Sequence, residues 1–379
     1  MIVLDISSFF SSASGGIRTY YAEKARHLPA RGIECHFVVP GETAETKAFG
    51  GGWMHRVPGP PLAGSPYYRR FGDWSALVRT LVEVDPDVVE IGSHYVLPEV
   101  VVPIARRFGR RRAVVGFYHA DYPSTYVGPA LRRAPARFRK AAVAASWTLV
   151  RRQHRRYAAT LVGSHHVADR LSEHGVPRVR WVGLGVDTET FRPREGERGD
   201  GPPVAAYVGR LSKDKELPLV LDAADRIHAT TGARVVVAGA GPMARAIEAF
   251  AASRPWFDFR GHLGNRQEVA ALLRASDAVL APGRYESFSL ATAEAMASGL
   301  PVIAADEGGA RELVVGSGGG FRFRPGDAAA LADAAEALLN LPVAERVRLG
   351  ARARAYVVSD HTWERVFERV HRVYREVSH

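Results

Sequence analysis

Cysteine is almost absent from this chain. Its 379 residues include a single cysteine, Cys35, which excludes an intrachain disulfide and a zinc site built from several thiolates. Chains without disulfides are typical of reducing compartments. The cysteine content therefore favours the cytosol.

Long apolar runs are missing as well. A membrane-spanning helix needs roughly 18 or more apolar residues in succession. The longest candidate, AAVAASWTLV at 141–150, is shorter and is flanked by arginines. The N-terminal segment MIVLDISSFF has no basic residue at its start and carries Asp5 inside the apolar stretch, unlike a signal peptide. We expect a cytoplasmic protein.

Negative charge is lacking in one part of the chain. Residues 122–168 contain no Asp or Glu. Residues 1–199 carry 29 Lys and Arg against 18 Asp and Glu, whereas residues 200–379 carry 22 of each, so the net charge of +11 lies in the first half. One basic half and one balanced half indicate two surfaces with different partners.

Short β-branched runs alternate with longer helical patterns along the chain, which is typical of parallel sheets covered by helices. The length suggests two domains. The segment FRPREGERGDGPP at 191–203 is charged, rich in Gly and Pro and without apolar periodicity, and is the predicted linker. We therefore predict an α/β protein with two doubly wound Rossmann-like domains, 1–195 and 200–360, facing a central cleft. The sequence leaves open whether the last helix, within 361–379, packs back on the first domain.

Two glutamates, Glu286 and Glu294, enclose seven residues in the stretch ESFSLATAE. The apolar run before them predicts a strand that ends at Pro282. A helix is expected from about Ser289, a residue type common at N-caps, to Gly299, a residue type common after helix ends. Glu286 is then in a loop at the carboxyl end of the strand, and Glu294 is inside the helix.

A helix N-terminus in this position predicts an anion site. The N–H groups of Ser289, Leu290 and Ala291 and the positive end of the helix dipole suit a phosphate. Carboxylates beside a phosphate are compatible with it when they accept hydrogen bonds from sugar and ribose hydroxyls. We interpret Glu286 as facing the sugar and Glu294 as facing the ribose of a nucleotide sugar. The alternative is that Glu286 caps a loop and Glu294 is a solvated helix residue.

A second segment indicates the same ligand. YVGRLSKDKE at 207–216 places Arg210 and Lys215 just after the first strand of the second domain. Gly209 permits close backbone approach, and two cations suit a diphosphate. Solvated surface charges are the alternative for an isolated Arg and Lys.

Together these stretches resemble the retaining glycosyltransferases of family 4 (group 1), which have the GT-B fold. The pair Glu286 and Glu294 matches the family's E-x7-E signature, and the resemblance extends along nearly the whole chain. The segments that carry it are GRLSKDK, GAGP, FRGHL, ESFSLATAEAMASGLPVIAADEGGARELV, SGGIRTYYAEKARHL near the start and LGVDTETFRP before the linker.

The resemblance implies roles for individual residues of the second domain. Arg210 and Lys215 would bind the donor diphosphate and stabilise the leaving group. Glu294 would hold the ribose, and Glu286 the hydroxyls of the transferred sugar. The backbones of Phe288, Ser289 and Leu290 would line the phosphate and sugar. His262 and Leu263 would flank the base, mainly through backbone contacts.

In the first domain the resemblance implies that Gly16 approaches the diphosphate when the cleft closes, and that His119 is near the reacting sugar. A buried core histidine at a strand end is the alternative for His119. The chain departs from the family at Ser287 and Ser289, where glycines are common. This departure puts close approach of the sugar at these two positions in question.

The implied reaction moves a hexose of the mannose or glucose type from a nucleotide-diphosphate sugar to a glycan, glycolipid or small-molecule acceptor. The resemblance implies retention of anomeric configuration, no obligatory metal and no cofactor apart from the donor substrate. No Asp-x-Asp motif lies at a plausible donor site, since DPD at 85–87 precedes a strand and indicates a turn. The charge of the leaving group would then be neutralised by Arg210, Lys215 and the helix dipole.

Two other function classes remain open from the residues alone. GAGPMA at 239–244 suggests a nicotinamide-dependent oxidoreductase, but Ala244 stands where the dinucleotide fingerprint has its last glycine. The basic first half suggests nucleic-acid binding, but no helix-turn-helix, zinc-finger or RNA-binding signature accompanies it. The transferase accounts for more of the sequence, and we expect no nucleic-acid partner.

The stretch 131–156 places two arginine clusters around an apolar segment. A helix of this kind can lie on an anionic membrane. Alternatively, its apolar residues belong to the domain core and its arginines are solvated. The apolar residues concerned are Phe138, Val143, Trp147, Leu149 and Val150. The sequence does not determine the donor sugar and base, the acceptor, the linkage or the oligomeric state.

Overall fold

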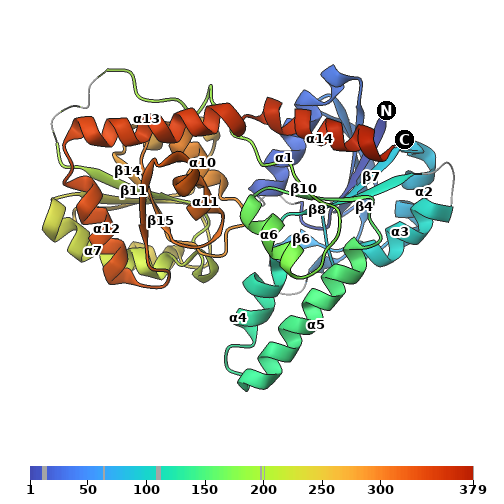
Figure 1. Cartoon of the computed structure of the whole chain (residues 1–379), viewed down its shortest axis with the longest axis horizontal. Helices are drawn as coiled ribbons and strands as arrows, with labels where there is room; N and C mark the ends of the chain where they lie inside the picture. Colours follow the sequence, from blue (N-terminus) through green and yellow to red (C-terminus); the bar gives the residue numbers. More distant parts are fainter. Residues whose placement is uncertain (11–14, 63–64, 108–111, 197–198, 200, 379) are drawn as a thin grey trace. The chain divides into compact units, whose positions relative to one another are not determined.

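The computed structural model describes residues 1–10, 15–62, 65–107, 112–196, 199 and 201–378. The chain folds into two compact units (Figure 1). Unit 1 contains Met1–Gly183 and Trp363–His379, and unit 2 contains Leu184–Thr362. Each unit has its own sheet and its own apolar core, and each is described separately below.

Unit 1 is built on a sheet with the strand order β10-β9-β8-β7-β1-β2-β4-β3 among the described residues. All neighbouring strands are parallel except β3 and β4. The strands of this sheet are β1 (Ile2–Ile6), β2 (Glu34–Gly41), β3 (Glu45–Phe49), β4 (Gly52–Pro58), β7 (Val88–Ile91), β8 (Ala113–Tyr118), β9 (Ala159–Val162) and β10 (Val179–Trp181). A separate antiparallel pair consists of β5 (Pro61–Leu62) and β6 (Ser65–Arg69). The strand order reverses between β1 and β7, so the loops that follow these two strands begin side by side.

The helices of unit 1 connect these strands. They are α1 (Gly16–His27), α2 (Trp74–Val84), α3 (Leu97–Arg107), α4 (Gly128–Ala130), α5 (Ala136–His154), α6 (His165–Glu173) and α14 (Trp363–Val377), with the short turns η1 (Pro29–Arg31) and η2 (Pro123–Val127). Asp73 and Ser164 cap α2 and α6, because each side chain accepts a hydrogen bond from a backbone N–H of the first turn. In Figure 1, α4 and α5 project together from unit 1.

The C-terminal helix α14 packs on unit 1 through a buried polar cluster. Lys24 of α1 donates hydrogen bonds to Asp5 Oδ1 (2.6 Å) and to the Tyr374 hydroxyl (2.5 Å), and the Tyr374 hydroxyl donates to Glu90. All four side chains are buried. Burial raises the pKa of Asp5. Burial also acts to raise the pKa of Glu90, but Lys24 and the hydrogen bonds from its partners outweigh it and lower that pKa. The cluster joins α14 to β1, α1 and β7.

Unit 2 has a parallel sheet with the order β13-β12-β11-β14-β15-β16 among the described residues. This is the order of a doubly wound dinucleotide-binding sheet. The strands are β11 (Val204–Val208), β12 (Arg234–Ala238), β13 (Phe257–Gly261), β14 (Ala278–Ala281), β15 (Val302–Ala305) and β16 (Gly320–Phe323). The helices are α7 (Leu217–Thr231), α8 (Ala244–Ala251), α9 (Arg266–Arg274), α10 (Leu290–Ala297), α11 (Gly308–Ser317), α12 (Ala328–Leu339) and α13 (Val343–Asp360), with the short turn η3 (Lys213–Lys215).

Apolar clusters of unit 2 lie on both faces of its sheet, since alternate residues of β11, such as Ala205 and Ala206, belong to different clusters. Sheets covered on both faces have strands that are apolar throughout, as Val235–Ala238 of β12 are. The prediction of two Rossmann-like α/β domains is confirmed by the two sheets.

The boundary between the units differs from the predicted linker. Phe191, at the start of the 191–203 segment, is buried in the core of unit 2, and its carbonyl accepts a hydrogen bond from Arg354 (3.1 Å). Residues 184–195 therefore belong to unit 2 instead of the first domain. The buried aromatic ring outweighs the polar composition of the surrounding residues.

Candidate active site

The loops after β11 and β14 form the candidate site of unit 2. These two strands are neighbours at the point where the strand order reverses. Doubly wound sheets bind ligands at this point, beyond the carboxyl ends of the strands. Residues 209–216 follow β11, and residues 282–289 follow β14. The two segments singled out in the sequence therefore meet at one edge of the sheet.

Lys215 and Glu286 form an ion pair across these loops. The Lys215 Nζ lies 2.7 Å from Glu286 Oε1, and the two side chains are 27% and 24% exposed. The structure thus brings together Lys215, the residue predicted to bind the diphosphate, and Glu286, the residue predicted to bind the sugar. Partial exposure leaves both groups accessible to a ligand, and the ammonium charge is balanced by the carboxylate until an anion binds.

Arg210 is the second predicted cation of the same loop. Its side chain is half exposed and forms an ion pair with Asp214. The Tyr207 hydroxyl of β11 donates a hydrogen bond to the Arg210 carbonyl (2.9 Å), which fixes the backbone where the strand ends. Tyr207 and Asp214 both lie within the segment YVGRLSKDKE, but no role was predicted for either of them.

The N-terminus of α10 lies in the second loop. The helix begins at Leu290 with Ser289 before it, as predicted, but Ser289 makes no capping bond to a backbone N–H. Its hydroxyl lies 2.9 Å from the Thr292 hydroxyl, and its backbone is left-handed with φ +75°. The family's frequent glycine at this position has a structural reason, because left-handed backbone favours glycine. Phe288, which precedes it, is buried.

The loop after β14 is held by a residue that the sequence did not indicate as part of the site. Gly309, at the start of α11, donates its backbone N–H to the Glu286 carbonyl (2.7 Å). A Cβ atom on Gly309 would lie 2.5 Å from the Phe288 Cα, so any other residue would displace the loop. Glycine here fixes the height of Glu286 above the sheet.

A second restraint on this loop is the ion pair between Arg284 and Glu216. The Arg284 Nε and backbone N–H donate to the two Glu216 carboxylate oxygens at 2.7 and 3.0 Å. Both side chains are mostly buried. One carboxylate oxygen accepts from the guanidinium and the other from the backbone N–H, which fixes the orientation of Glu216. This pair joins Glu216, next to Lys215, to Arg284, two positions before Glu286, and therefore positions the two loops relative to each other.

Glu294 lies inside α10 and is not a solvated helix residue. Burial raises its pKa to about 7, while Arg266 acts to lower the pKa and Asp187 acts to raise it. Arg266 and Asp187 themselves approach to 3.9 Å. The carboxyl group therefore changes charge near neutral pH, which the sequence did not predict because its burial depends on tertiary packing.

His262 and Leu263 follow β13, which is separated from β11 by β12. His262 is exposed and Leu263 is half-buried. The segment GAGPMA at 239–244, which suggested a dinucleotide fingerprint, follows β12. Gly241 in this loop has φ +158°, and a Cβ atom there would lie 2.4 Å from the Leu211 carbonyl oxygen. Close packing against the Arg210 loop thus accounts for this glycine.

The other two predicted site residues, Gly16 and His119, belong to unit 1. Gly16 is exposed and is the first residue of α1, whereas Ser14, which begins the same motif, lies outside the described residues. His119 follows β8, and its ring stacks on Phe117 with centroids 4.1 Å apart. Burial lowers the pKa of His119 to about 4, so its imidazole is neutral at pH 7.

The DPD turn has a structural role. Asp85 ends α2 with a left-handed backbone and pairs with Arg112 at 2.5 Å. Asp87 accepts a hydrogen bond from the Ile2 N–H at the start of β1 (2.8 Å). Within the described part of the chain, no group of three or more His, Cys, Asp or Glu side chains is arranged to hold a metal ion.

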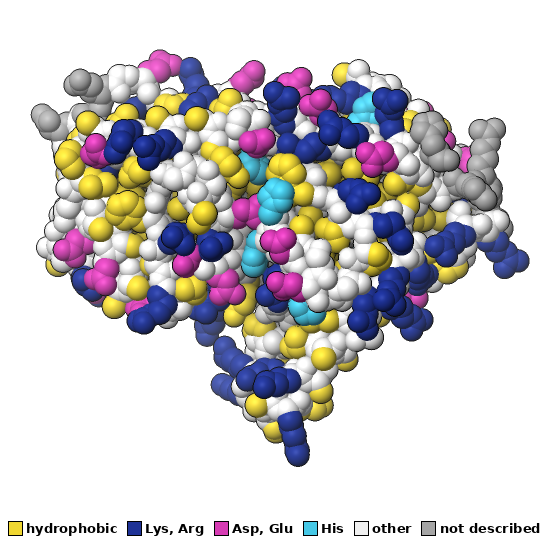
Figure 2. Space-filling view, in the orientation of Figure 1, with side chains coloured by type: hydrophobic (Ala, Val, Ile, Leu, Met, Phe, Trp, Pro, Cys, Tyr) yellow, Lys and Arg dark blue, Asp and Glu magenta, His cyan; other side chains and the backbone are white. Residues whose placement is uncertain are grey.

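Most of the basic stretch forms α5 (Ala136–His154), and residues 131–135 connect α5 to the short helix α4. Trp147 and Val150 are buried in the unit 1 core, where Trp147 stacks on His174 at 3.7 Å. Phe138 is 57% exposed, and basic side chains gather around the projecting helices in Figure 2. Trp147 and Val150 therefore belong to the domain core, whereas Phe138 does not. No helix in the described ranges is long and apolar enough to cross a membrane.

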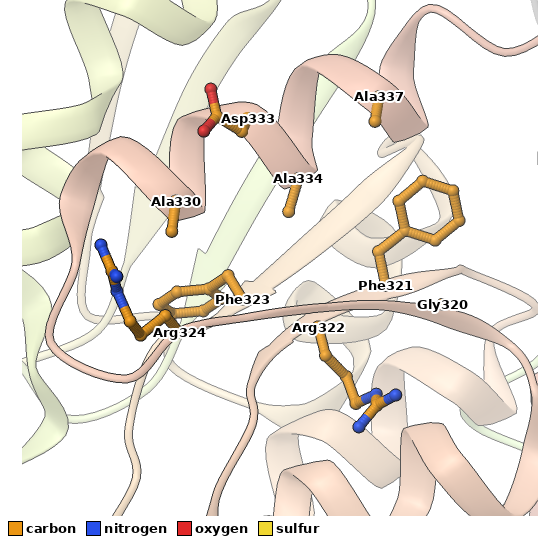
Figure 3. A pocket seen from close by; sticks show the side chains of 9 residues that line it. All are labelled: Gly320, Phe321, Arg322, Phe323, Arg324, Ala330, Asp333, Ala334 and Ala337. Atoms are coloured by element: carbon orange, nitrogen blue, oxygen red, sulfur yellow. The ribbon is translucent and has the colours of Figure 1, made fainter.

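Two cavities of unit 2 contain none of the predicted residues. One, of about 590 Å³, lies between β16 and α12 (Figure 3), where three alanines of α12 point toward the strand. Its lining residues are Gly320, Phe321, Arg322, Phe323, Arg324, Ala330, Asp333, Ala334 and Ala337. The other, of about 540 Å³, is lined by Glu189, Thr190, Arg192, Gln267 and Arg274.

Comparisons with known proteins identify the family to which the chain belongs. Residues 187–356 match the family described as glycosyl transferases group 1, and residues 14–190 match glycosyltransferase family 4. The chain belongs to this glycosyltransferase family. The resemblance noted from the sequence is thereby confirmed, and neither the oxidoreductase nor the nucleic-acid alternative is favoured.

Two curated relatives match over nearly their whole length. The GDP-mannose-dependent alpha-mannosyltransferase of Mycolicibacterium smegmatis is 30% identical over 385 residues, covering 96% of this chain and 94% of the relative. The GDP-mannose-dependent alpha-(1-6)-phosphatidylinositol dimannoside mannosyltransferase of Mycobacterium tuberculosis is 29% identical over 381 residues, covering 96% and 93%.

Solved structures with low identity share the fold. Sucrose-phosphate synthase from Thermosynechococcus elongatus has a TM-score of 0.79 at 19% identity and covers 99% of this chain and 98% of its own. HepE from Anabaena in complex with UDP-glucose has a TM-score of 0.73 at 17% identity, covering 100% and 99%. The predicted GT-B fold class is confirmed by these neighbours.

Proposed function

We propose that this protein is a retaining hexosyltransferase that transfers mannose from GDP-mannose to a glycan or glycolipid acceptor. The observation that carries the proposal is the Lys215–Glu286 ion pair at the point where the strand order of unit 2 reverses. A cation for the diphosphate and a carboxylate for sugar hydroxyls are adjacent there. GDP-mannose is proposed as donor because the relatives that match over their whole length are named for it.

Lys215, Arg210 and the N-terminus of α10 would stabilise the negative charge that develops on the departing diphosphate. This arrangement supports a reaction without an obligatory metal and without a cofactor other than the donor. Glu286 would accept hydrogen bonds from hydroxyls of the transferred sugar, and Glu294 from the ribose. We assign no carboxylate nucleophile, since Glu286 is better explained as a residue that binds sugar hydroxyls.

Unit 1 is proposed to bind the acceptor. His119, at the carboxyl end of β8, is neutral at pH 7 because burial lowers its pKa to about 4. It can therefore donate or accept a hydrogen bond to a hydroxyl without adding charge. Gly16 at the start of α1 is proposed to approach the diphosphate, as in the family resemblance.

We further propose a cytoplasmic protein that associates peripherally with anionic membrane. Support comes from the start of α5 and the residues before it, where Phe138 is exposed and the exposed cations Arg132, Arg133, Arg137 and Lys140 are close to it along the chain. A basic surface with a protruding aromatic ring suits the interface of an anionic bilayer. A glycolipid acceptor would be reached from that position.

The donor is tested with purified protein and a panel of GDP-mannose, UDP-glucose and UDP-N-acetylglucosamine in excess EDTA. A phosphatidylinositol mannoside extract serves as acceptor, and the anomeric configuration of the product is read by proton NMR. We expect an α-linked mannoside from GDP-mannose alone. Turnover that stops in EDTA and returns with Mg²⁺ or Mn²⁺ would contradict the metal-free reaction, and a β-linked product would contradict retention.

A further inference from the structure

A row of aromatic rings lies at the edge of the unit 1 sheet where the strand order reverses. We call Tyr68, Phe9, Tyr95 and Tyr122 the aromatic row. Phe9 follows β1, Tyr95 follows β7 and Tyr122 follows β8, so all three lie beyond the carboxyl ends of adjacent strands. Ligands bind at this edge in doubly wound sheets. No sequence motif or comparison assigns these residues a role.

The four rings are in successive contact. Ring centroids are 6.3 Å apart for Tyr68 and Phe9, 6.2 Å for Phe9 and Tyr95, and 5.2 Å for Tyr95 and Tyr122. The first two pairs meet edge to face, at 77° and 72°. Tyr122 is buried, whereas Tyr95 is 44% exposed. The row therefore runs from the core to an accessible aromatic face.

Tyr95 is held in an unfavourable backbone conformation. Its φ of +74° lies in the left-handed region, which is uncommon for a bulky residue. The buried side chain of Gln153 on α5 donates a hydrogen bond to the Tyr95 carbonyl (2.8 Å). Backbone strain of this kind persists where the surroundings enforce it, and it is concentrated at ligand sites.

The neighbouring loops are also fixed to each other. The Ser93 hydroxyl accepts a hydrogen bond from the Ser8 N–H (2.8 Å) and lies 3.1 Å from the Ser7 hydroxyl. These bonds join the loop that carries Phe9 to the loop that carries Tyr95. The rings are therefore held by the backbone, as a preorganised binding surface requires.

We propose that the aromatic row is a subsite for a pyranose ring of the acceptor. The C–H bonds on one face of a pyranose carry small positive charge and pack well on the negative face of an aromatic ring. The four rings carry no formal charge, and tyrosine adds hydroxyls that can bond to sugar hydroxyls at the rim. An uncharged sugar fits these features better than a phosphate, which needs cations, or an acyl chain, which has no use for the hydroxyls.

The inference rests on the proposed transferase function, because only that function makes the bound sugar an acceptor. It goes further by naming the residues and requiring that the acceptor present a sugar ring, so that a simple alcohol is a poor substrate. The probe is α-1,6-mannobiose, studied with the whole protein. Saturation-transfer NMR measures its binding without turnover, and initial rates with GDP-mannose measure its KM.

We expect saturation transfer from the wild-type protein to the ring C–H protons of mannobiose. Tyr95→Ala should raise the KM for mannobiose roughly tenfold, with the KM for GDP-mannose and the kcat within about twofold of wild type. Tyr68→Ala should shift the same KM in the same direction, and its backbone carries no left-handed strain. Tyr95→Phe should raise this KM by no more than about threefold, because the ring carries most of the contact and the hydroxyl adds one hydrogen bond at the rim.

Trp53→Ala is the matched control. Trp53 is 45% exposed, like Tyr95, but lies near the amino end of β4 at the opposite edge of the sheet. It should leave mannobiose binding unchanged. Wild-type protein without saturation transfer, or an unchanged KM in both alanine variants, would overturn the subsite. Mannobiose binding without turnover of any sugar nucleotide would support the subsite while contradicting the proposed function.

Discussion

Lys215 Nζ lies 2.7 Å from Glu286 Oε1, although 71 positions separate the two residues along the chain. They follow two different strands, which become neighbours only because the strand order of unit 2 reverses between β11 and β14. The topology of the sheet therefore brings these two residues together. A donor diphosphate would exchange the carboxylate partner of Lys215 for phosphate oxygens and leave Glu286 available to sugar hydroxyls.

Lys215→Ala and Glu286→Ala are each expected to lower kcat with GDP-mannose by about 10²–10³-fold. A preorganised charge that stabilises the transition state is worth this much. The fold should remain intact, because a partly exposed ion pair contributes only about 0–1 kcal/mol to the free energy of unfolding. Steady-state rates and thermal denaturation of both variants measure the two effects.

Arg254→Ala is the control for these variants. Arg254 is also 27% exposed and pairs with Asp225 at 2.8 Å, but it follows α8, away from the β11 and β14 loops. Its kcat should match the wild-type value. Near-wild-type turnover by Lys215→Ala or Glu286→Ala would remove these residues from the mechanism.

Glu294 predicts a pH dependence of donor binding. Burial raises its pKa to about 7, so the carboxylate that would accept ribose hydrogen bonds becomes protonated below neutral pH. The affinity for GDP-mannose, whose phosphates do not titrate between pH 6 and 8, should fall as the pH decreases from 8 to 6, whereas Glu294→Gln should bind it weakly and show little dependence on pH over this range. Isothermal titration calorimetry checks both expectations.

The same residue predicts an opposite effect on stability. A carboxyl whose folded-state pKa is raised stabilises the fold at low pH, and this contribution is lost as the pH rises through about 7. Glu294→Gln removes the buried charge, so the variant should have a higher Tm than wild type at pH 8 and a smaller advantage at pH 5.5. An equal Tm difference at both values would show that Glu294 is ionised without a penalty.

Much of unit 2 could be predicted because the signals are local. The apolar run before Pro282, the helix near Ser289 and the position of Glu294 inside it all follow from short-range periodicity and turn residues. Their arrangement in the structure agrees, with α10 at Leu290–Ala297. The family resemblance supplied the roles.

Other features could not be predicted because their partners are far apart in the sequence. Glu216 and Arg284 are 68 positions apart, and Lys24 and Tyr374 are 350 apart. No local pattern distinguishes these charges from solvated ones. The left-handed backbone of Tyr95 and Ser289 has the same origin, since tertiary contacts enforce it against the preference of the residues.

Ser289 permits a direct test of that strain. Ser289→Gly and Ser289→Ala both remove the hydroxyl contact with Thr292, but only glycine adopts φ +75° without a steric penalty. Ser289→Gly should therefore be more stable than Ser289→Ala by about 1 kcal/mol. Urea denaturation measures the difference, and equal stabilities would show that this position is not strained.

The exposed cations between α4 and the start of α5 predict binding to anionic membrane. Each cation near the surface of such a membrane contributes about 1 kcal/mol, or roughly fivefold in the partition coefficient, and the term is screened by salt. Replacing Arg132, Arg133, Arg137 and Lys140 by alanine should abolish co-sedimentation with vesicles that contain phosphatidylserine. Phe138→Ala should weaken it less, because one exposed ring adds a smaller apolar contribution.

The control for this charge removal is a variant with four exposed arginines replaced elsewhere, at Arg226, Arg324, Arg348 and Arg365. It loses the same net charge but keeps the four cations at 132–140, so it should sediment with anionic vesicles almost as wild type does. Wild-type binding should also decrease as NaCl is raised, and neutral vesicles should bind little. If both variants lose binding equally, overall charge is responsible and α4–α5 is not the membrane surface. If the wild-type protein binds neither kind of vesicle, an acceptor in solution is the better expectation.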